Sequence, residues 1–173
     1  MDIELSIIIP AFNEQDNITP LYQELNKVLS DLGKSYEIIF IDDGSTDATF
    51  ARLEELHKID PLVKVIKFKK NFGQSAAMKA GFDHAHGKLL ITMDADLQND
   101  PQDIPRMIDK MAQGYDAICG WRHKRNDRYS KKELSKLANW FRSGISRCRS
   151  MTVCLISVIA ILRFSACEVL QSA

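Results

Sequence analysis

Short apolar runs alternate with helix-like stretches along most of the chain, and this alternation restricts the fold more than any other feature. Apolar and often β-branched residues fill five runs that predict strands: residues 5–9, 37–41, 63–68, 89–93 and 116–120. The stretches between these runs contain helix start signals, stop signals or helical periodicity, and they predict helices over residues 17–32, 47–58, 74–85 and 101–113. Strands and helices that alternate with short links form right-handed crossovers, so the pattern predicts an α/β fold with a mainly parallel sheet.

Length and composition fit a single domain of this kind. The chain has 173 residues, of which 45% are hydrophobic and 27% charged, which excludes a disordered, collagen-like or wholly coiled-coil protein. The four cysteines form no C-x-x-C pair, so we expect free thiols and no structural zinc. The first residues are polar and resemble no signal peptide, so we expect a cytoplasmic location.

Clusters of polar residues follow four of the five apolar runs within a few residues. They are Asn13-Glu14, Asp42-Asp43, Asn71–Gln74 and Asp94-Ala95-Asp96. Ligands of open parallel sheets bind at the carboxyl ends of the strands, where these clusters would meet. The sequence therefore predicts one ligand site at that edge of the sheet.

The Asp94-Ala95-Asp96 cluster predicts a site for a hard cation. Strand alternation puts Asp94 and Asp96 on the same side, and Gln98 follows with an amide oxygen. Carboxylate and carbonyl oxygens suit Mg²⁺ or Mn²⁺, which substrate phosphates commonly help to bind. The alternative is a solvated acidic loop that caps the helix expected at Pro101.

Two other loops each have a functional and a structural interpretation. The carboxylates of Asp42-Asp43-Gly44-Ser45 suit a nucleobase or ribose, but the segment also suits a turn followed by a helix cap. Basic residues in Lys69–Gln74 lie beside a helix start and suit a diphosphate, or they form a solvated loop. Neither a G-x-G-x-x-G nor a P-loop fingerprint is present, and all four histidines are expected at the surface.

The zero formal net charge conceals an acidic body and a basic arm. Residues 1–121 carry 12 basic and 20 acidic side chains, whereas residues 122–149 carry 10 basic and two acidic ones. A helix expected over residues 131–146 has one apolar stripe and suits an anionic membrane interface or packing on the domain. A nucleic acid partner is not expected, because no aromatic stacking platform or helix-turn-helix accompanies the charge.

Five motifs, in order, resemble the family 2 glycosyltransferases, and more narrowly the polyprenyl-phosphate sugar transferases of the dolichyl-phosphate mannose synthase type. The motifs are Ile8-Ile9-Pro10-Ala11-Phe12-Asn13-Glu14, Ile41-Asp42-Asp43-Gly44-Ser45-Thr46-Asp47, Asn71-Phe72-Gly73-Gln74, Met93-Asp94-Ala95-Asp96-Leu97-Gln98 and Gly120-Trp121-Arg122. A weaker match follows in Ser135–Asn139. The resemblance implies a Rossmann-like, nucleotide-sugar-binding domain of the glycosyltransferase A type.

The resemblance also implies roles for individual residues. The nucleotide sugar would be bound by Pro10, Ala11, Asn13, Glu14, Asp42, Asp43, Lys70, Gly73, Gln74, Asp94 and Ala95. The metal, Mg²⁺ or Mn²⁺, would be bound by Asp94, Asp96 and Gln98. The lipid phosphate would be bound by Arg122, Lys131 and Ser135, with Asp96 and Arg122 as the catalytic residues.

The implied reaction is inverting transfer of a sugar from a nucleotide-diphosphate sugar to a polyprenyl phosphate, undecaprenyl or dolichyl. It would take place at the inner membrane face, where the protein is peripheral. The alternatives are a non-catalytic nucleotide-sugar-binding domain and a soluble family 2 transferase that acts on a saccharide. The sequence leaves the sugar, the nucleotide and the oligomeric state open, a homo-oligomer included.

The resemblance stops after Ser146, and this divides the chain into three expected parts. Residues 1–121 form the donor-binding domain, residues 122–146 the basic acceptor and membrane segment, and residues 147–173 an atypical tail. We expect the family's C-terminal part to be missing or frameshifted here, and transfer to be weak or absent. The tail contains an uncharged run of 13 residues, 150–162, which is too short to span a bilayer and has no obvious partner.

Overall fold

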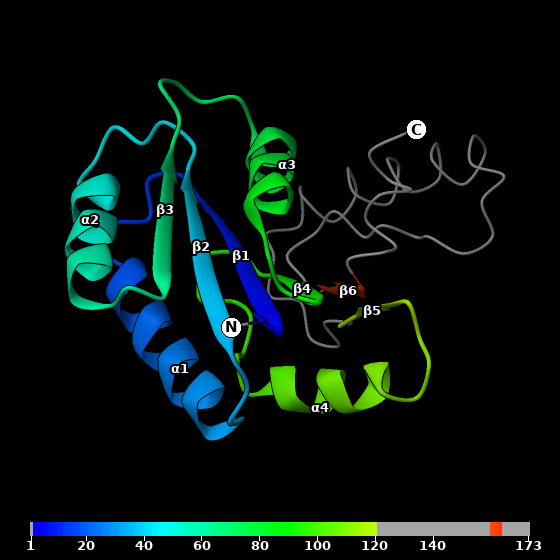
Figure 1. The fold of residues 1–173 in the computed structure, drawn as a ribbon. Helices are drawn as coiled ribbons and strands as arrows, with labels where there is room; N and C mark the ends of the chain where they lie inside the picture. The colour runs from blue at the N-terminus through cyan, green and yellow to red at the C-terminus, as the bar shows by residue number, and fades with distance from the viewer. Residues whose placement is uncertain (1, 121–159, 164–173) are drawn as a thin grey trace, which may run out of the picture. The chain divides into compact units, whose positions relative to one another are not determined.

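A computed structural model describes residues 2–120 and 160–163, which lie in one compact unit. Six strands form one sheet in the order β3-β2-β1-β4-β6-β5 (Figure 1). The strands are β1 (Leu5–Ala11), β2 (Tyr36–Asp42), β3 (Val63–Lys67), β4 (Leu89–Thr92), β5 (Ala117–Cys119) and β6 (Ala160–Arg163). The helices are α1 (Ile18–Asp31), α2 (Thr49–Ile59), α3 (Gln74–His84) and α4 (Asp103–Met111).

The first four strands in the sheet order are parallel, as the alternating pattern predicts. β1 lies between β2 and β4, with Ile8 opposite Ile39 on one side and Thr92 on the other. β6 runs antiparallel to both β4 and β5. The predicted α/β fold is confirmed, and all four helices appear within two residues or so of their expected bounds.

Side chains of successive strand residues enter two separate cores, one on each face of the sheet. Ile7 and Ile9 pack in a large core with α1, α2 and α4, whereas Ile8 packs in a smaller core with α3. All three isoleucines are fully buried. A strand buried on both faces must be apolar at every position, which explains the continuous apolar runs in the sequence.

β1 continues through Pro10 to Ala11, two residues beyond the predicted strand over residues 5–9. Pro10 stays in register with Ile41 of β2. The pairing of β1 with β4 stops at Ile8, whose carbonyl accepts the Met93 amide at 3.1 Å. Since alternate residues of a strand point their backbone groups to the same side, the missing N–H of Pro10 falls where β4 has already ended.

β6 was not expected from the sequence, and it corrects one prediction about the tail. Residues 160–162 of the uncharged run pair with both β4 and β5, and Ile161 is fully buried in the larger core. The expectation that this run has no partner is therefore wrong for these residues. The contact between β5 and the rest of the sheet depends on β6, which lies between β4 and β5.

Several predictions concern residues that lie outside the described part of the chain. These are the helix over residues 131–146 and the acceptor-phosphate residues Arg122, Lys131 and Ser135. The domain boundaries proposed near residues 121 and 146 also stay predictions. Within residues 2–120 and 160–163, no helix has the length and apolar character needed to span a membrane.

Candidate functional site

A cavity of about 310 Å³ lies where the carboxyl ends of β1, β2, β3 and β4 meet. Its lining consists of Pro10, Ala11, Phe12, Glu14, Asp43, Asn71, Gly73, Gln74, Asp94, Ala95 and Asp96. Nine of these eleven residues belong to the predicted site. The structure therefore brings the four polar clusters of the sequence together around one space.

The loops after β1 and β2 are joined through Asn13. Its backbone amide donates to Ser45 Oγ at 3.0 Å, and its Oδ1 accepts the Thr46 amide at 2.9 Å. Asn13 has a φ of 57°, a left-handed conformation that asparagine tolerates better than most residues. Asn13 does not line the cavity itself. Its hydrogen bonds instead hold together the two loops whose other residues form the cavity wall.

A second set of bonds joins the same two loops through Asp47. Its carboxylate accepts Thr49 Oγ1 at 2.5 Å, the Thr49 amide at 2.9 Å and the Gln15 amide at 3.3 Å. Burial acts to raise the pKa of Asp47, but these hydrogen bonds outweigh it and lower the pKa. Thr49 Oγ1 in turn accepts the Glu14 amide at 2.8 Å, which fixes the backbone beside the cavity.

The adjacent carboxylates Asp42 and Asp43 are both buried but occupy different surroundings. Asp42 Oδ1 accepts the Ser45 amide at 3.1 Å and closes the turn, and its Oδ2 is buried with no hydrogen-bond partner in the described residues. Asp43 lines the cavity and accepts the amides of Phe72 and Gly73 at 2.8 and 2.9 Å. Asp42 thus matches the structural interpretation of this loop, whereas Asp43 reaches the cavity.

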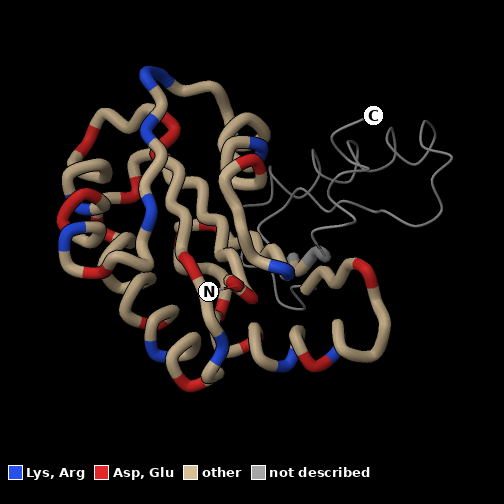
Figure 2. The backbone as a smooth tube through the Cα atoms, in the orientation of Figure 1, with Lys and Arg blue, Asp and Glu red and all other residues tan. Residues whose placement is uncertain are grey.

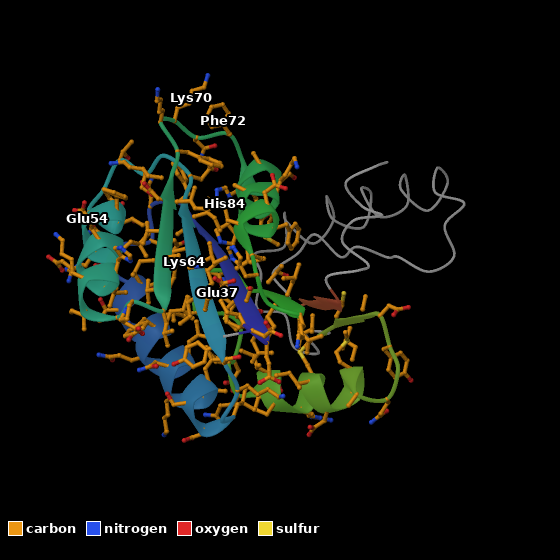
Figure 3. All side chains as sticks on the ribbon, in the orientation of Figure 1. Glu37, Glu54, Lys64, Lys70, Phe72 and His84 are labelled. Carbon is orange, nitrogen blue, oxygen red and sulfur yellow. The ribbon has the colours of Figure 1, made fainter. Side chains whose placement is uncertain are left out.

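The loop between β3 and α3 passes directly over Gly44. A Cβ atom at Gly44, whose φ is +70°, would lie 2.3 Å from the Lys70 carbonyl carbon, so only glycine fits there. Lys70 and Phe72 extend from the end of this loop, with Lys70 Nζ 5.2 Å from the centre of the Phe72 ring (Figure 3). Figure 2 shows basic residues at the same end of the loop. Lys70 does not line the cavity.

Asp94 and Asp96 both line the cavity, as the sequence predicts, but Gln98 does not. Asp96 Oδ1 accepts the Gln98 amide at 3.0 Å, and Gln98 itself lines a larger hollow of about 800 Å³ between α1 and α4. Leu97, between them, has a φ of 57°, so the loop turns sharply there. This turn directs Gln98 toward the second hollow.

The carboxylates of the cavity suit a metal ion whose remaining coordination positions are filled by a substrate. In the described part of the chain, no group of three or more His, Cys, Asp and Glu side chains is placed to hold a metal ion. Two carboxylates in one cavity match Mg²⁺ or Mn²⁺, which keep waters and phosphate oxygens as their other ligands. The cavity is therefore suited to a cation that arrives with a phosphate-bearing ligand.

Phe12 and Asn71 line the cavity, although the resemblance assigns neither an individual binding role and Asn71 is expected at the site only as part of the polar cluster Asn71–Gln74. Both lie inside the motifs quoted for the site, between residues that were predicted. Phe12 is 43% exposed, which is unusual for a large apolar side chain that directly follows a buried strand. The sequence signal that could have identified Phe12 is an aromatic residue between an apolar run and a polar cluster.

A model of glycosyl transferase family 2 matches residues 6–170. Undecaprenyl-phosphate 4-deoxy-4-formamido-L-arabinose transferase from Klebsiella pneumoniae (strain 342) is 40% identical over 137 residues. The match covers 79% of this chain and 42% of that relative, so the chain spans less than half of the relative's length. The resemblance identified from the five motifs is confirmed.

Solved structures show the same fold at low sequence identity. The mannosyltransferase from Pyrobaculum calidifontis, in complex with GDP-Man and Mn²⁺, has a TM-score of 0.63 at 18% identity, covering 98% of this chain and 47% of that one. Glucosyl-3-phosphoglycerate synthase from Mycobacterium tuberculosis, with Mn²⁺, UDP and phosphoglyceric acid, has a TM-score of 0.66 at 19% identity, covering 94% and 56%. Since the family model matches nearly the whole sequence, the chain belongs to glycosyl transferase family 2.

Proposed function

We propose that this chain is the donor-binding body of an inverting glycosyltransferase that moves a sugar from a nucleotide-diphosphate sugar to a polyprenyl phosphate. The observation that carries the proposal is the cavity at the carboxyl edge, where Asp94 and Asp96 share a lining with Glu14 and Asp43. Carboxylates that follow β1, β2 and β4 and line one cavity suit a ligand with both a nucleoside and a cation-bound diphosphate.

The donor would lie across the first and fourth strands of the parallel sheet. Pro10, Ala11, Asp43 and Glu14 would contact or frame the nucleoside, with Asn13 and Asp42 shaping the loops behind them. Gly73 and Gln74 would face the diphosphate, and Asp94 and Asp96 would hold Mg²⁺ or Mn²⁺. A bound divalent cation would stabilise the negative charge on the departing nucleoside diphosphate.

Polyprenyl phosphate is proposed as the acceptor because of the Klebsiella relative, whose name states undecaprenyl phosphate. A phosphate monoester is already ionised at neutral pH, since its second pKa is about 6, and needs little help from a general base. Single in-line attack on the anomeric carbon inverts its configuration. We assign Arg122, Lys131 and Ser135 to the acceptor phosphate from their motif positions, with Arg122 and Asp96 acting at the reacting atoms.

Membrane association would be peripheral and electrostatic. Residues 122–149 supply 10 basic side chains, and each Lys or Arg near an anionic surface contributes about 1 kcal/mol. This segment would attract the lipid phosphate at the cytoplasmic face of the membrane.

A transfer assay tests the proposal. Labelled UDP- and GDP-sugars are incubated with the full chain, Mn²⁺, and anionic vesicles that contain undecaprenyl phosphate. Lipid-linked label that needs both Mn²⁺ and undecaprenyl phosphate supports the proposal. Donor binding without transfer would favour the non-catalytic alternative, and label on an added saccharide alone would favour a soluble transferase.

A further inference from the structure

We propose that Gln74 is a positioning residue that orients Asp94 for the cation, and that Asp43 places Gln74 by holding the loop before it. The inference rests on the proposed function, because it assigns how the two ends of the donor cavity are coupled. Asp43 follows β2 and Asp94 follows β4, so the connection crosses the whole site through the β3–α3 loop.

The first step is the contact between Asp43 and the loop. The carboxylate is 3% exposed, and each of its oxygens accepts one backbone amide, from Phe72 at 2.8 Å and from Gly73 at 2.9 Å. Hydrogen bonds to a charged acceptor in a buried setting are among the strongest in proteins. Gly73 has a φ of +92°, a conformation open to glycine, and it turns the chain into α3.

The second step is the contact between Gln74 and Asp94. Gln74 is the first residue of α3, so its position follows directly from that of Gly73. Its Nε2 donates to Asp94 Oδ1 at 2.8 Å. A carboxylate that is held through one oxygen keeps a fixed orientation, with the second oxygen directed as the first requires.

The physical effect is to prepare Asp94 before a ligand arrives. Ordering a carboxylate side chain when a cation binds costs conformational entropy, and the contact with Gln74 lowers that cost because it is already made. Residues that orient a metal ligand typically change metal affinity by about 10- to 100-fold when they are mutated. Gln74 is exposed, so we expect the lower end of that range.

The experiment separates this role from contact with the nucleoside by using a probe that has no base. Mn²⁺ affinity of the full chain is measured by electron paramagnetic resonance of free Mn²⁺, with pyrophosphate at saturation. Gln74→Met keeps the length of the side chain but removes the donor. Gln23→Ala, on the exposed face of α1, is the matched control.

We expect Gln74→Met to weaken Mn²⁺ binding about tenfold, with the Mn²⁺ affinity of Gln23→Ala unchanged. Asp43→Asn should also weaken Mn²⁺ binding, and this effect should largely disappear in the Gln74→Met background. Unchanged affinity in Gln74→Met would overturn the inference while leaving the proposed function intact. Failure of the wild-type chain to bind Mn²⁺ would overturn both.

Discussion

Lys64 Nζ lies 2.6 Å from Oε2 of Glu37 (Figure 3). Glu37 belongs to the interior strand β2 and is only 1% exposed, which is unusual for a carboxylate. The other oxygen of Glu37 accepts Ser6 Oγ at 2.5 Å and the His86 amide at 2.7 Å. The Glu37 carboxylate thus connects β1, β2, β3 and the α3–β4 turn. It lies near the amino ends of these strands, whereas the cavity lies at their carboxyl ends. Burial acts to raise the pKa of Glu37, but the hydrogen bonds and the Lys64 charge outweigh it and lower the pKa.

This arrangement predicts that Glu37 stabilises the fold at neutral pH and not in acid. A carboxyl whose pKa is lowered on folding stabilises the protein above its ordinary pKa, and the effect is lost as pH falls through the folded value. We expect Glu37→Gln to cost about 2 kcal/mol of unfolding free energy at pH 7. Urea denaturation at pH 7 and pH 3 is the measurement. The exposed Glu54→Gln is the control, and a difference for Glu37→Gln that persists unchanged at pH 3 would contradict the assignment.

Replacing Asn13 with alanine should destabilise the protein more than replacing it with glycine. Both variants lose the bond to the Thr46 amide, which contributes about 1 kcal/mol. Alanine also has to adopt a φ of 57°, which costs about 1 kcal/mol more. We expect losses of about 2 kcal/mol for Asn13→Ala and about 1 kcal/mol for Asn13→Gly in chemical denaturation. Equal losses would show that the left-handed backbone conformation is not populated.

Gly44→Ala should damage both the fold and the cavity. The added methyl would meet the Lys70 backbone at 2.3 Å, so the β3–α3 loop would have to move. Gly33 has a similar φ of +62°, but no atom lies within 4 Å of a Cβ placed there. We expect Gly33→Ala to cost about 1 kcal/mol with nucleotide affinity unchanged, and Gly44→Ala to cost more and to weaken nucleotide binding. Thermal denaturation and calorimetry would measure the two effects, and similar results for both variants would refute the close approach.

Ile161 should contribute to stability as a core residue. It is fully buried in β6, between β4 and β5, so Ile161→Ala should cost about 2–4 kcal/mol. Ile59, which is 77% exposed at the end of α2, is the matched control, and Ile59→Ala should change stability by less than about 0.5 kcal/mol. Indistinguishable urea midpoints for the two variants would argue that residues 160–163 are not part of the sheet.

The parallel part of the sheet and its helices could be predicted from the sequence because their signals are local. A strand buried on both faces has to be apolar throughout, and the run over residues 37–41 shows this directly. Gly33 follows α1 in a left-handed conformation, as a helix stop signal predicts. In contrast, Pro10 continues its strand because of where β4 ends, and that is a contact between distant parts of the chain.

β6 could not be predicted for a related reason. Its first three residues are the end of a long uncharged run with no alternation or turn signal, and its partner strands lie about 40 and 70 residues earlier in the chain. In the site, the sequence placed Asp42 and Asp43 together, but only the contacts of each loop decide which one lines the cavity. The left-handed turn at Leu97 similarly separates Gln98 from Asp96.

Calorimetric titration of the full chain with UDP and with GDP, in Mn²⁺ and in EDTA, tests the central claim most directly. We predict that one of the two nucleotides binds in Mn²⁺, and that EDTA weakens its affinity by at least about tenfold, or 1.4 kcal/mol. Asp96→Ala should cause a similar loss in Mn²⁺ and little further change in EDTA, because the carboxylate acts through the cation. Nucleotide affinity that is the same in Mn²⁺ and EDTA, or the same in Asp96→Ala and wild type, would contradict a metal-dependent donor site between β1 and β4.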